Sequence, residues 1–182
     1  MQDIAKLLHC SLHVVSYWLR KHKIKVRSIS EAIYLKNNPD GDPFKFRSPR
    51  TAREAKLLGI GFGLYWGEGT RANKASVRLG NTDSRLIKTF MEFLVKIFGV
   101  KKENFLFSLQ IFTDIDTNKA IRFWMKELGV RRSQFSRTTI TLSGSLGTYR
   151  KKSRYGVLTL YYHNKKLRDL LVEKLVEIAS DL

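Results

Sequence analysis

Apolar residues recur along this chain in two rhythms, one typical of helices and one typical of strands. The helical rhythm is clearest where a capping residue precedes it and a glycine ends it, as Asp83 and Gly99 do around one segment. Strict alternation of apolar and polar residues marks the shorter strand segments. The expected helices of this part of the chain span 52–67, 83–98, 117–128 and 165–178, and the expected strands span 74–81, 105–112, 138–143 and 155–163.

The order of these elements predicts the fold class. Helices and strands are mixed along the chain, which is typical of an α+β domain, and we expect its strands to pair antiparallel. Segments 138–143 and 155–163 are expected to form a hairpin. One face of the sheet is expected to be polar and basic. Along 74–81 the apolar side carries Ala75, Val77 and Leu79, and the polar side carries Lys74, Ser76 and Arg78.

A domain boundary is expected before these elements. All three prolines fall in one short stretch, together with Gly41 and several Asn and Asp residues. Turn formers at this density mark a boundary. The predicted organisation is a small N-terminal module at 1–36, a linker at 37–50 and the main domain at 51–182.

The N-terminal module carries two short helical patterns separated by a turn. Ser11 is placed to cap the second helix, 12–21, by accepting a backbone hydrogen bond. His9 stands at the turn position that glycine often occupies, and His adopts left-handed backbone more readily than most residues. The turn is therefore compatible with two helices that fold back on each other.

The packing expected between these helices is that of a helix-turn-helix. The small Ala5 lets the helices cross closely, and Val15 and Trp18 are expected to close the angle between them. The second helix would then enter a major groove. A helical hairpin with a solvated basic face is the alternative. The expected groove contacts are Ser11, His13 and Tyr17, and the expected phosphate contacts include Arg20 and Lys21.

The net charge of the chain indicates which class of partner it binds. Lys and Arg total 34 against 16 Asp and Glu, a formal net charge of +18. Such an excess indicates a polyanionic partner, nucleic acid first and an anionic membrane surface second. The longest apolar stretch, 57–66, is about half of the roughly 20 residues that a membrane-spanning helix needs. The single cysteine, Cys10, excludes an intrachain disulfide and fits a reducing compartment.

The segment 57–70 holds the most unusual pattern. Gly59, Gly63 and Gly67 follow one another at intervals of four residues within a helical, otherwise large and apolar segment. Each glycine costs a helix about 1 kcal/mol relative to Ala, so the pattern needs a reason. Glycines at this spacing form one smooth stripe that lets a second helix approach closely. The helix is therefore expected to be buried on nearly every side, and these three glycines are the expected interface residues.

Glu68 follows directly at the C-terminal end of this helix. A carboxylate there faces the negative end of the helix dipole, which a nearby cation would compensate. The placement favours a metal site or a buried ion pair. A tight crossing within one chain, with Glu68 as its solvated end, is the alternative explanation of the whole pattern.

Gly63-Leu64-Tyr65-Trp66-Gly67-Glu68-Gly69 resembles the tail of the motif that names the LAGLIDADG homing endonucleases. The resemblance covers roughly residues 52–178 in element order and is sharp over about a dozen residues. Tyr65 and Trp66 depart from the motif, which has an aliphatic residue and an acid there. The resemblance implies an antiparallel sheet saddle over the duplex with helices on one face. Because this chain has one motif, it also implies a homodimer.

The family resemblance further implies metal-dependent hydrolysis of the phosphodiester in double-stranded DNA. Glu68 is the position of the catalytic acid, and Glu68 with Gly67 is the expected binding position for Mg²⁺ or Mn²⁺. Lys165, at a strand-to-helix junction, matches a basic active-site residue. Asn81 and Asp83, at the end of a strand, match polar residues near the attacking water.

Basic and hydroxyl residues of the main domain are the expected DNA contacts. From 143 to 168 the chain has seven Lys or Arg and no acid, which is typical of phosphate binding. A flexible basic loop is expected within it. The predicted DNA-binding residues of the main domain are Arg71, Lys74, Arg78, Arg137, Thr139, Thr141, Arg150, Lys151, Lys152 and Arg154.

Two other functions remain open at the level of sequence. A DNA-binding transcriptional regulator could keep a LAGLIDADG-like fold without cleaving, and the altered Tyr65-Trp66 pair fits that alternative. RNA binding or maturase activity is the other. For all of them the expected location is the cytoplasm, on the nucleoid if the source is bacterial or archaeal.

Overall fold

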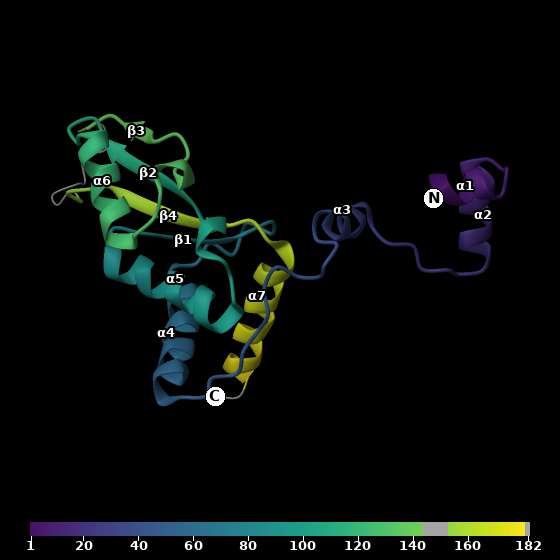
Figure 1. Cartoon of the computed structure of the whole chain (residues 1–182), viewed down its shortest axis with the longest axis horizontal. Coiled ribbons are helices and arrows are strands. Elements are labelled where there is room, and N and C mark those ends of the chain that lie inside the picture. Colours follow the sequence, from purple (N-terminus) through teal and green to yellow (C-terminus); the bar gives the residue numbers. More distant parts are fainter. Residues whose placement is uncertain (144–152, 181–182) are drawn as a thin grey trace. The chain divides into compact units, whose positions relative to one another are not determined.

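The computed structural model describes residues 1–143 and 153–180. They form two compact units, Met1–Asp42 and Pro43–Leu182 (Figure 1). Each unit is described by itself below. Among the described residues, no helix combines the length and the apolar character needed to cross a membrane.

The first unit contains α1 (Gln2–Leu7), α2 (Leu12–Lys21) and α3 (Ile29–Asn37). The two helices expected from the pattern are present, and the Ser11 hydroxyl caps α2 by accepting from the backbone N–H of Val14 at 3.4 Å. His9 has a φ of 47°, so it adopts the left-handed conformation that the turn requires. Ala5 and Val15 are the buried apolar residues of this unit.

Trp18 does not close the angle between α1 and α2 as expected. Its side chain is 48% exposed, and it stacks on His22 with ring centroids 5.4 Å apart. Only Val15 of the expected pair is buried, because α1 is too short to cover a second large side chain.

The third helix of this unit was not predicted. It starts at a capping box, in which the Ser28 side chain accepts from the Glu31 N–H and the Glu31 carboxylate accepts from the Ser28 N–H. These hydrogen bonds lower the pKa of the Glu31 carboxyl. The cap was readable from Ser28 and Glu31, but the segment lacks a clear apolar stripe.

The second unit begins with a segment that packs against its core. The backbone N–H groups of Lys45 and Arg47 donate to the carbonyls of Phe98 and Ile97, at 2.7 and 2.8 Å. The Phe46 ring lies 5.6 Å from the Phe98 ring. Part of the segment 37–50 is thus attached to the second unit.

The elements of the second unit follow the predicted order closely. Asp83 and Asp116 cap two of the helices, and Gly99 and Gly129 end the same helices in left-handed conformation, as the pattern indicates. The helices are α4 (Ala52–Glu68), α5 (Ser84–Phe98), α6 (Thr117–Leu128) and α7 (Lys165–Ser180), with short 3-10 turns η1 (Lys102–Asn104) and η2 (Arg132–Gln134). The strands are β1 (Val77–Asn81), β2 (Leu106–Phe112), β3 (Thr139–Thr141) and β4 (Val157–Tyr162).

These strands form one mixed sheet in the order β1-β4-β2-β3. β4 lies between β1 and β2 and is antiparallel to both, with Leu79 opposite Leu160 and Phe107 opposite Leu160 on its other side. β3 runs parallel to β2, with Gln110 opposite Thr139. The α+β class is confirmed.

The predicted hairpin between 138–143 and 155–163 is wrong. β3 pairs with β2 and not with β4. β3 follows α6, and a helical crossover of this kind returns a strand parallel to its predecessor. Alternation identified the strands, but it carries no information about their partners.

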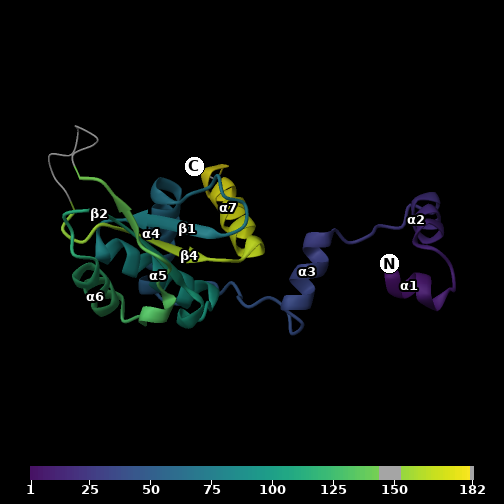
Figure 2. The same cartoon turned by 90° about the horizontal axis from the view of Figure 1, so that it is seen from above.

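One face of the sheet builds the core. Figure 2 shows α5 and α6 on the same side of the sheet, and their apolar stripes join the inward residues of the strands in a single cluster. The Trp124 side chain of α6 is fully buried there. The inward strand residues are Val77, Leu79, Phe107, Leu109, Ile111, Leu158 and Leu160.

The opposite face carries the alternate residues and is less covered. Arg78 lies opposite Tyr161, and Gly80 lies opposite Thr159, which is also opposite Ser108. Ser76 lies beside Arg78, as expected, but its side chain is not exposed on this face. It is fully buried before β1 begins, where its hydroxyl donates to Asn73 and accepts from Arg78.

Candidate functional site

The C-terminal half of α4 is held by the aromatic side chains of α5. Gly61 is buried, and a Cβ at this position would lie 2.2 Å from the Phe93 ring, so only glycine fits. Phe62 meets Phe93 edge-on at 5.3 Å, and Tyr65 stacks on Phe90 at 5.9 Å. One side of α4 is therefore fixed to the core.

The other side of α4 is open. Gly59, Gly63 and Gly67 are exposed, and apart from adjacent residues and the backbone of α4 itself, no atom of the described residues would lie within 4 Å of a Cβ built on any of them. Ile60 and Trp66 beside this stripe are 41% and 43% exposed. The expectation that α4 is buried on nearly every side is thus wrong for the single chain, because α5 covers only the side of Gly61, Phe62 and Tyr65.

The end of α4 is joined to β1 by backbone contacts. Gly69 forms a bridge to Leu79, and the N–H of Thr70 donates to the Arg78 carbonyl at 3.0 Å. A Cβ on Gly69 would lie 2.3 Å from the Tyr65 carbonyl oxygen, so this tight exit from the helix requires glycine. It leaves Glu68 exposed beside the C-terminal half of β1.

The carboxylate of Glu68 forms no hydrogen bond or ion pair within the part of the chain that the structure describes. The same residues contain no group of three or more His, Cys, Asp and Glu that could hold a metal ion. Within residues 1–143 and 153–180, the end of α4 therefore carries one unpaired carboxylate.

The side chains of Asn81 and Asp83 make hydrogen bonds with residues close to them in the sequence. The Asn81 side-chain oxygen accepts from the Asp83 N–H at 3.0 Å. Asp83 caps α5, and hydrogen bonds from the side chain and backbone of Arg85 hold the pKa of its carboxyl below the usual range. Both side chains therefore have a structural role in starting α5.

Lys165 is the first residue of α7 and forms an ion pair with Asp169 one turn later. Both side chains are about half exposed. Exposed pairs of this kind contribute about 0–1 kcal/mol, so a phosphate could replace Asp169 as the partner of Lys165 at little cost.

Arg168 is a site residue that the sequence interpretation missed. Its guanidinium donates to the Arg71 carbonyl at 2.6 Å and to Asp169 at 3.0 Å, which connects α7 to the segment after α4. Its side chain is 13% exposed. A basic residue one turn after Lys165 was the available signal, but the contact with residue 71 depends on the tertiary fold.

Two buried polar atoms near this connection have no partner among the described residues. They are the Tyr65 hydroxyl and the Nε of Arg168. Burial raises the pKa of the Tyr65 hydroxyl, while the nearby charges of Arg168 and Arg71 act in the opposite direction. Arg168, which is partly buried, therefore contributes a positive charge beside the end of α4.

Several predicted DNA contacts share the open face of the sheet. The Arg78 guanidinium lies over the Tyr161 ring at 5.0 Å and donates to Ser76. Thr139 and Thr141 lie opposite Gln110 and Phe112, so they face the same side from the other edge. Arg71, Lys74 and Arg137 are exposed in the connecting segments, and Arg150, Lys151 and Lys152 lie outside the described residues.

Arg154 is separated from this face. It stacks over Tyr155 and lines a hollow beside α6, which lies on the core side of the sheet. In the first unit, His13, Tyr17, Arg20 and Lys21 are exposed on α2, whereas the Ser11 side chain is occupied as the helix cap. The Lys21 ammonium lies 4.6 Å from the Trp18 ring centre.

Comparisons of this chain with family models, with curated proteins and with solved structures find no significant match. We therefore infer the function from the residues and their arrangement.

Proposed function

We propose that this protein is a site-specific, metal-dependent endonuclease for double-stranded DNA that acts as a homodimer. The observation that carries the proposal is the open glycine stripe of α4 with the unpaired Glu68 at its end. A stripe that costs helix stability and packs against no other element of the described residues is explained by a second copy of the same helix.

The dimer follows from the shape and chemistry of α4. The exposed Gly59, Gly63 and Gly67 allow close backbone approach, and the exposed Ile60 and Trp66 beside them would be removed from water by a partner. A contact between identical stripes is self-complementary and gives a closed twofold dimer. A twofold axis that runs along the two helices, so that they pack in parallel, would bring the two Glu68 carboxylates together at the same end of the interface.

The residues at this end fit a divalent cation. Glu68 supplies a carboxylate, and the Gly67 carbonyl belongs to the last helical turn, where carbonyls lack intrahelical partners. Hard oxygen donors of this type suit Mg²⁺ or Mn²⁺. Because the described residues supply no third ligand at this end of α4, the site is completed by the second chain and the DNA phosphate. When bound, the cation activates water and stabilises the leaving oxygen.

Other residues of the chain bind and orient the duplex. Arg78, Thr139 and Thr141 on the open sheet face contact the backbone or base edges. Lys165 exchanges Asp169 for the reacting phosphate and stabilises its developing charge, and the partly buried Arg168 adds positive potential behind it. The α2 helix of the first unit acts as the recognition helix of a helix-turn-helix.

A non-cleaving DNA-binding regulator is the second candidate. It is favoured by the local contacts of Asn81, Asp83 and Lys165, which give each residue a structural role without any catalysis. Both candidates require DNA binding, and they differ in whether Glu68 does chemistry.

Incubation with a randomised plasmid library and Mg²⁺ or Mn²⁺ separates the two candidates. The wild type is expected to produce metal-dependent cuts that are lost in Glu68→Gln. The matched control is Glu103→Gln, which neutralises another exposed carboxylate, in η1, and is expected to cleave normally. Tight binding by the wild type without cuts would favour the regulator, and cuts that persist in Glu68→Gln would contradict the assigned role of Glu68.

A further inference from the structure

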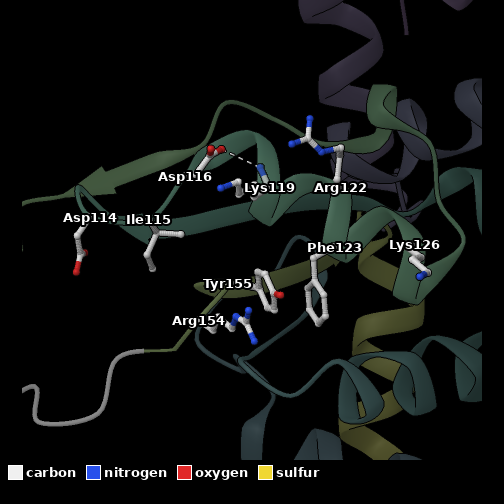
Figure 3. A pocket seen from close by; sticks show the side chains of 9 residues that line it. All are labelled: Asp114, Ile115, Asp116, Lys119, Arg122, Phe123, Lys126, Arg154 and Tyr155. Carbon is white, nitrogen blue, oxygen red and sulfur yellow. Dashed lines mark hydrogen bonds between the residues drawn. The ribbon is translucent and has the colours of Figure 1, made fainter.

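A second cationic site lies on the core side of the sheet, away from the open face. A hollow of about 610 Å³ beside α6 is lined by residues of α6 and of the turn before β4 (Figure 3). Four of its lining residues are positively charged. They are Lys119, Arg122, Lys126 and Arg154.

None of these four side chains forms a salt bridge with a carboxylate of the described residues, whereas some other cations of the same unit do. Lys96, Lys165 and Lys174 each form an ion pair along their own helix. No ion pair within the described residues involves any of the four side chains that line the hollow. Like charges gathered in excess of their counter-charges repel one another, so the arrangement indicates an anionic ligand.

The two acidic residues of the hollow offset its four positive charges only in part, and the Asp116 carboxylate interacts with Lys119 and Arg122. Asp116 caps α6 by accepting from the Lys119 N–H at 2.9 Å, and this bond holds the pKa of its carboxyl below the usual range. Asp114 lies at the opposite end of the hollow from Lys126 (Figure 3). The hollow therefore keeps a positive balance around Arg122, Lys126 and Arg154.

Arg154 is held in place by an aromatic stack. The Tyr155 ring lies parallel to the Phe123 ring with centroids 3.8 Å apart, and the Arg154 guanidinium lies 5.5 Å from the Tyr155 centroid. Figure 3 shows the Tyr155 ring between the side chains of Phe123 and Arg154. The Tyr155 carbonyl accepts from the indole N–H of the buried Trp124 at 2.9 Å, which anchors the stack to the core.

This stack favours phosphate binding over base stacking. Phe123 and Arg154 cover the Tyr155 ring, so the ring is not free to receive a base. A guanidinium that is fixed by an aromatic ring is instead preorganised to bind a phosphate through two N–H groups.

The cations on α6 extend over a length that several phosphates of a DNA strand also cover. Lys119, Arg122 and Lys126 are spaced three and four residues apart and share one face of the helix. They span about 10 Å along the axis at roughly 1.5 Å per residue. Successive phosphates of one DNA strand advance by about 3.4 Å along the duplex axis, so three or four of them fall within this length.

We infer that the hollow beside α6 is a second phosphate-binding site, which binds backbone phosphates of a DNA strand beyond the sheet. The inference rests on the proposed DNA-binding function, and it does not require cleavage. The site would extend the bound DNA from the open face to the helical side of the second unit.

The test measures binding of the full chain to a short mixed-sequence duplex, without divalent cations, over a range of salt concentrations. The variant is Lys119→Gln/Arg122→Gln/Lys126→Gln. The matched control is Lys45→Gln/Lys88→Gln/Lys101→Gln, which removes the same charge at exposed positions outside the hollow. Thermal unfolding of each protein verifies that it is folded.

Loss of three phosphate contacts is expected to lower the slope of log K against log salt by about 2–3 and to weaken binding at least about tenfold at moderate salt. The control is expected to change the slope by less than the loss of one phosphate contact would. Equal slopes for the two variants would overturn the inference and leave the proposed function intact. No DNA binding by the wild type would overturn both.

Competition assays distinguish the source of the phosphate. A second duplex is expected to displace the labelled DNA from the wild type far better than tripolyphosphate or polyglutamate at equal charge. Equal competition by tripolyphosphate would assign the hollow to free phosphate compounds. Equal competition by polyglutamate would show a general polyanion surface. Either result contradicts a site built for a DNA strand.

Discussion

Single polar side chains begin several helices of this protein, and their effects are local. Asn164 is the clearest case, because it lies directly before α7 and is 5% exposed. Its side-chain oxygen accepts from the Leu167 N–H at 2.9 Å, and its own carbonyl accepts from the Arg168 N–H. It thereby positions the first turn of α7, which carries Lys165 and Arg168.

Asn164→Ala is expected to lower the free energy of unfolding by about 1–2 kcal/mol, since it removes a helix cap and leaves a buried N–H without its acceptor. Asn164→Asp keeps the acceptor and should retain most of the stability. Urea denaturation measures both variants. An unchanged midpoint for Asn164→Ala would contradict the capping role.

Asp169 is expected to make the second unit sensitive to acid. Burial raises the pKa of its carboxyl, but hydrogen bonds from Lys165 and Arg168 outweigh burial and lower it. The folded-state pKa thus lies below the unfolded value of about 4. The resulting stability is present above that value and is lost as the pH falls through the folded-state pKa.

Asp169→Asn removes this contribution. Its free energy of unfolding is expected to fall less between neutral pH and strong acid than that of the wild type, in paired urea titrations. Asp3→Asn is the control, because Asp3 lies outside the second unit and forms no ion pair with the described residues. Identical acid sensitivity of Asp169→Asn and the wild type would contradict the ion-pair assignment.

At the scale of elements, α4 combines two kinds of glycine that the sequence alone does not separate. Gly61 is buried against Phe93, whereas Gly63 faces open space. The spacing of four residues grouped Gly59, Gly63 and Gly67 correctly as one stripe. It could not show that α5 covers only the opposite side.

These glycines are expected to respond differently to alanine. Gly61→Ala should destabilise the folded chain by about 1–3 kcal/mol, because the new methyl group overlaps the Phe93 ring. Gly63→Ala should not destabilise the monomer, and helix propensity favours it by up to about 1 kcal/mol. Chemical denaturation at low protein concentration measures both, and a large loss in Gly63→Ala would contradict the open stripe.

The elements that were predicted well depend on neighbouring residues. Asp83 and Asp116 start helices, and Gly99 and Gly129 end them, because caps are formed within one turn. The partner of β3 was wrong because strand pairing joins distant parts of the chain. The candidate site shows the same division, since Glu68 was placed by its helix while Arg168 depends on contact with residue 71.

At the scale of the whole molecule, the positive charge is not uniform. The formal charge of +18 indicates a polyanionic partner, but composition cannot assign it to a surface. The fold separates Arg78 on the open sheet face from Arg154 in the hollow beside α6. The sequence interpretation placed both in one DNA-binding surface, because the direction of a side chain after a turn depends on tertiary packing.

The proposed active site depends most on the pairing of two α4 helices. Cysteine cross-linking tests that pairing directly, in a Cys10→Ser background that removes the native thiol. Gly59→Cys, Gly63→Cys and Gly67→Cys place a thiol at each position of the stripe in turn, and Lys88→Cys on the exposed side of α5 is the control.

On mild oxidation, at least one of the three stripe variants is expected to form a covalent dimer rapidly, because symmetry brings the same position of both chains together. The Lys88→Cys control is expected to stay monomeric. If all three stripe variants stay monomeric under these conditions, and the unmodified protein sediments as a monomer with and without DNA, the proposed active site cannot be assembled.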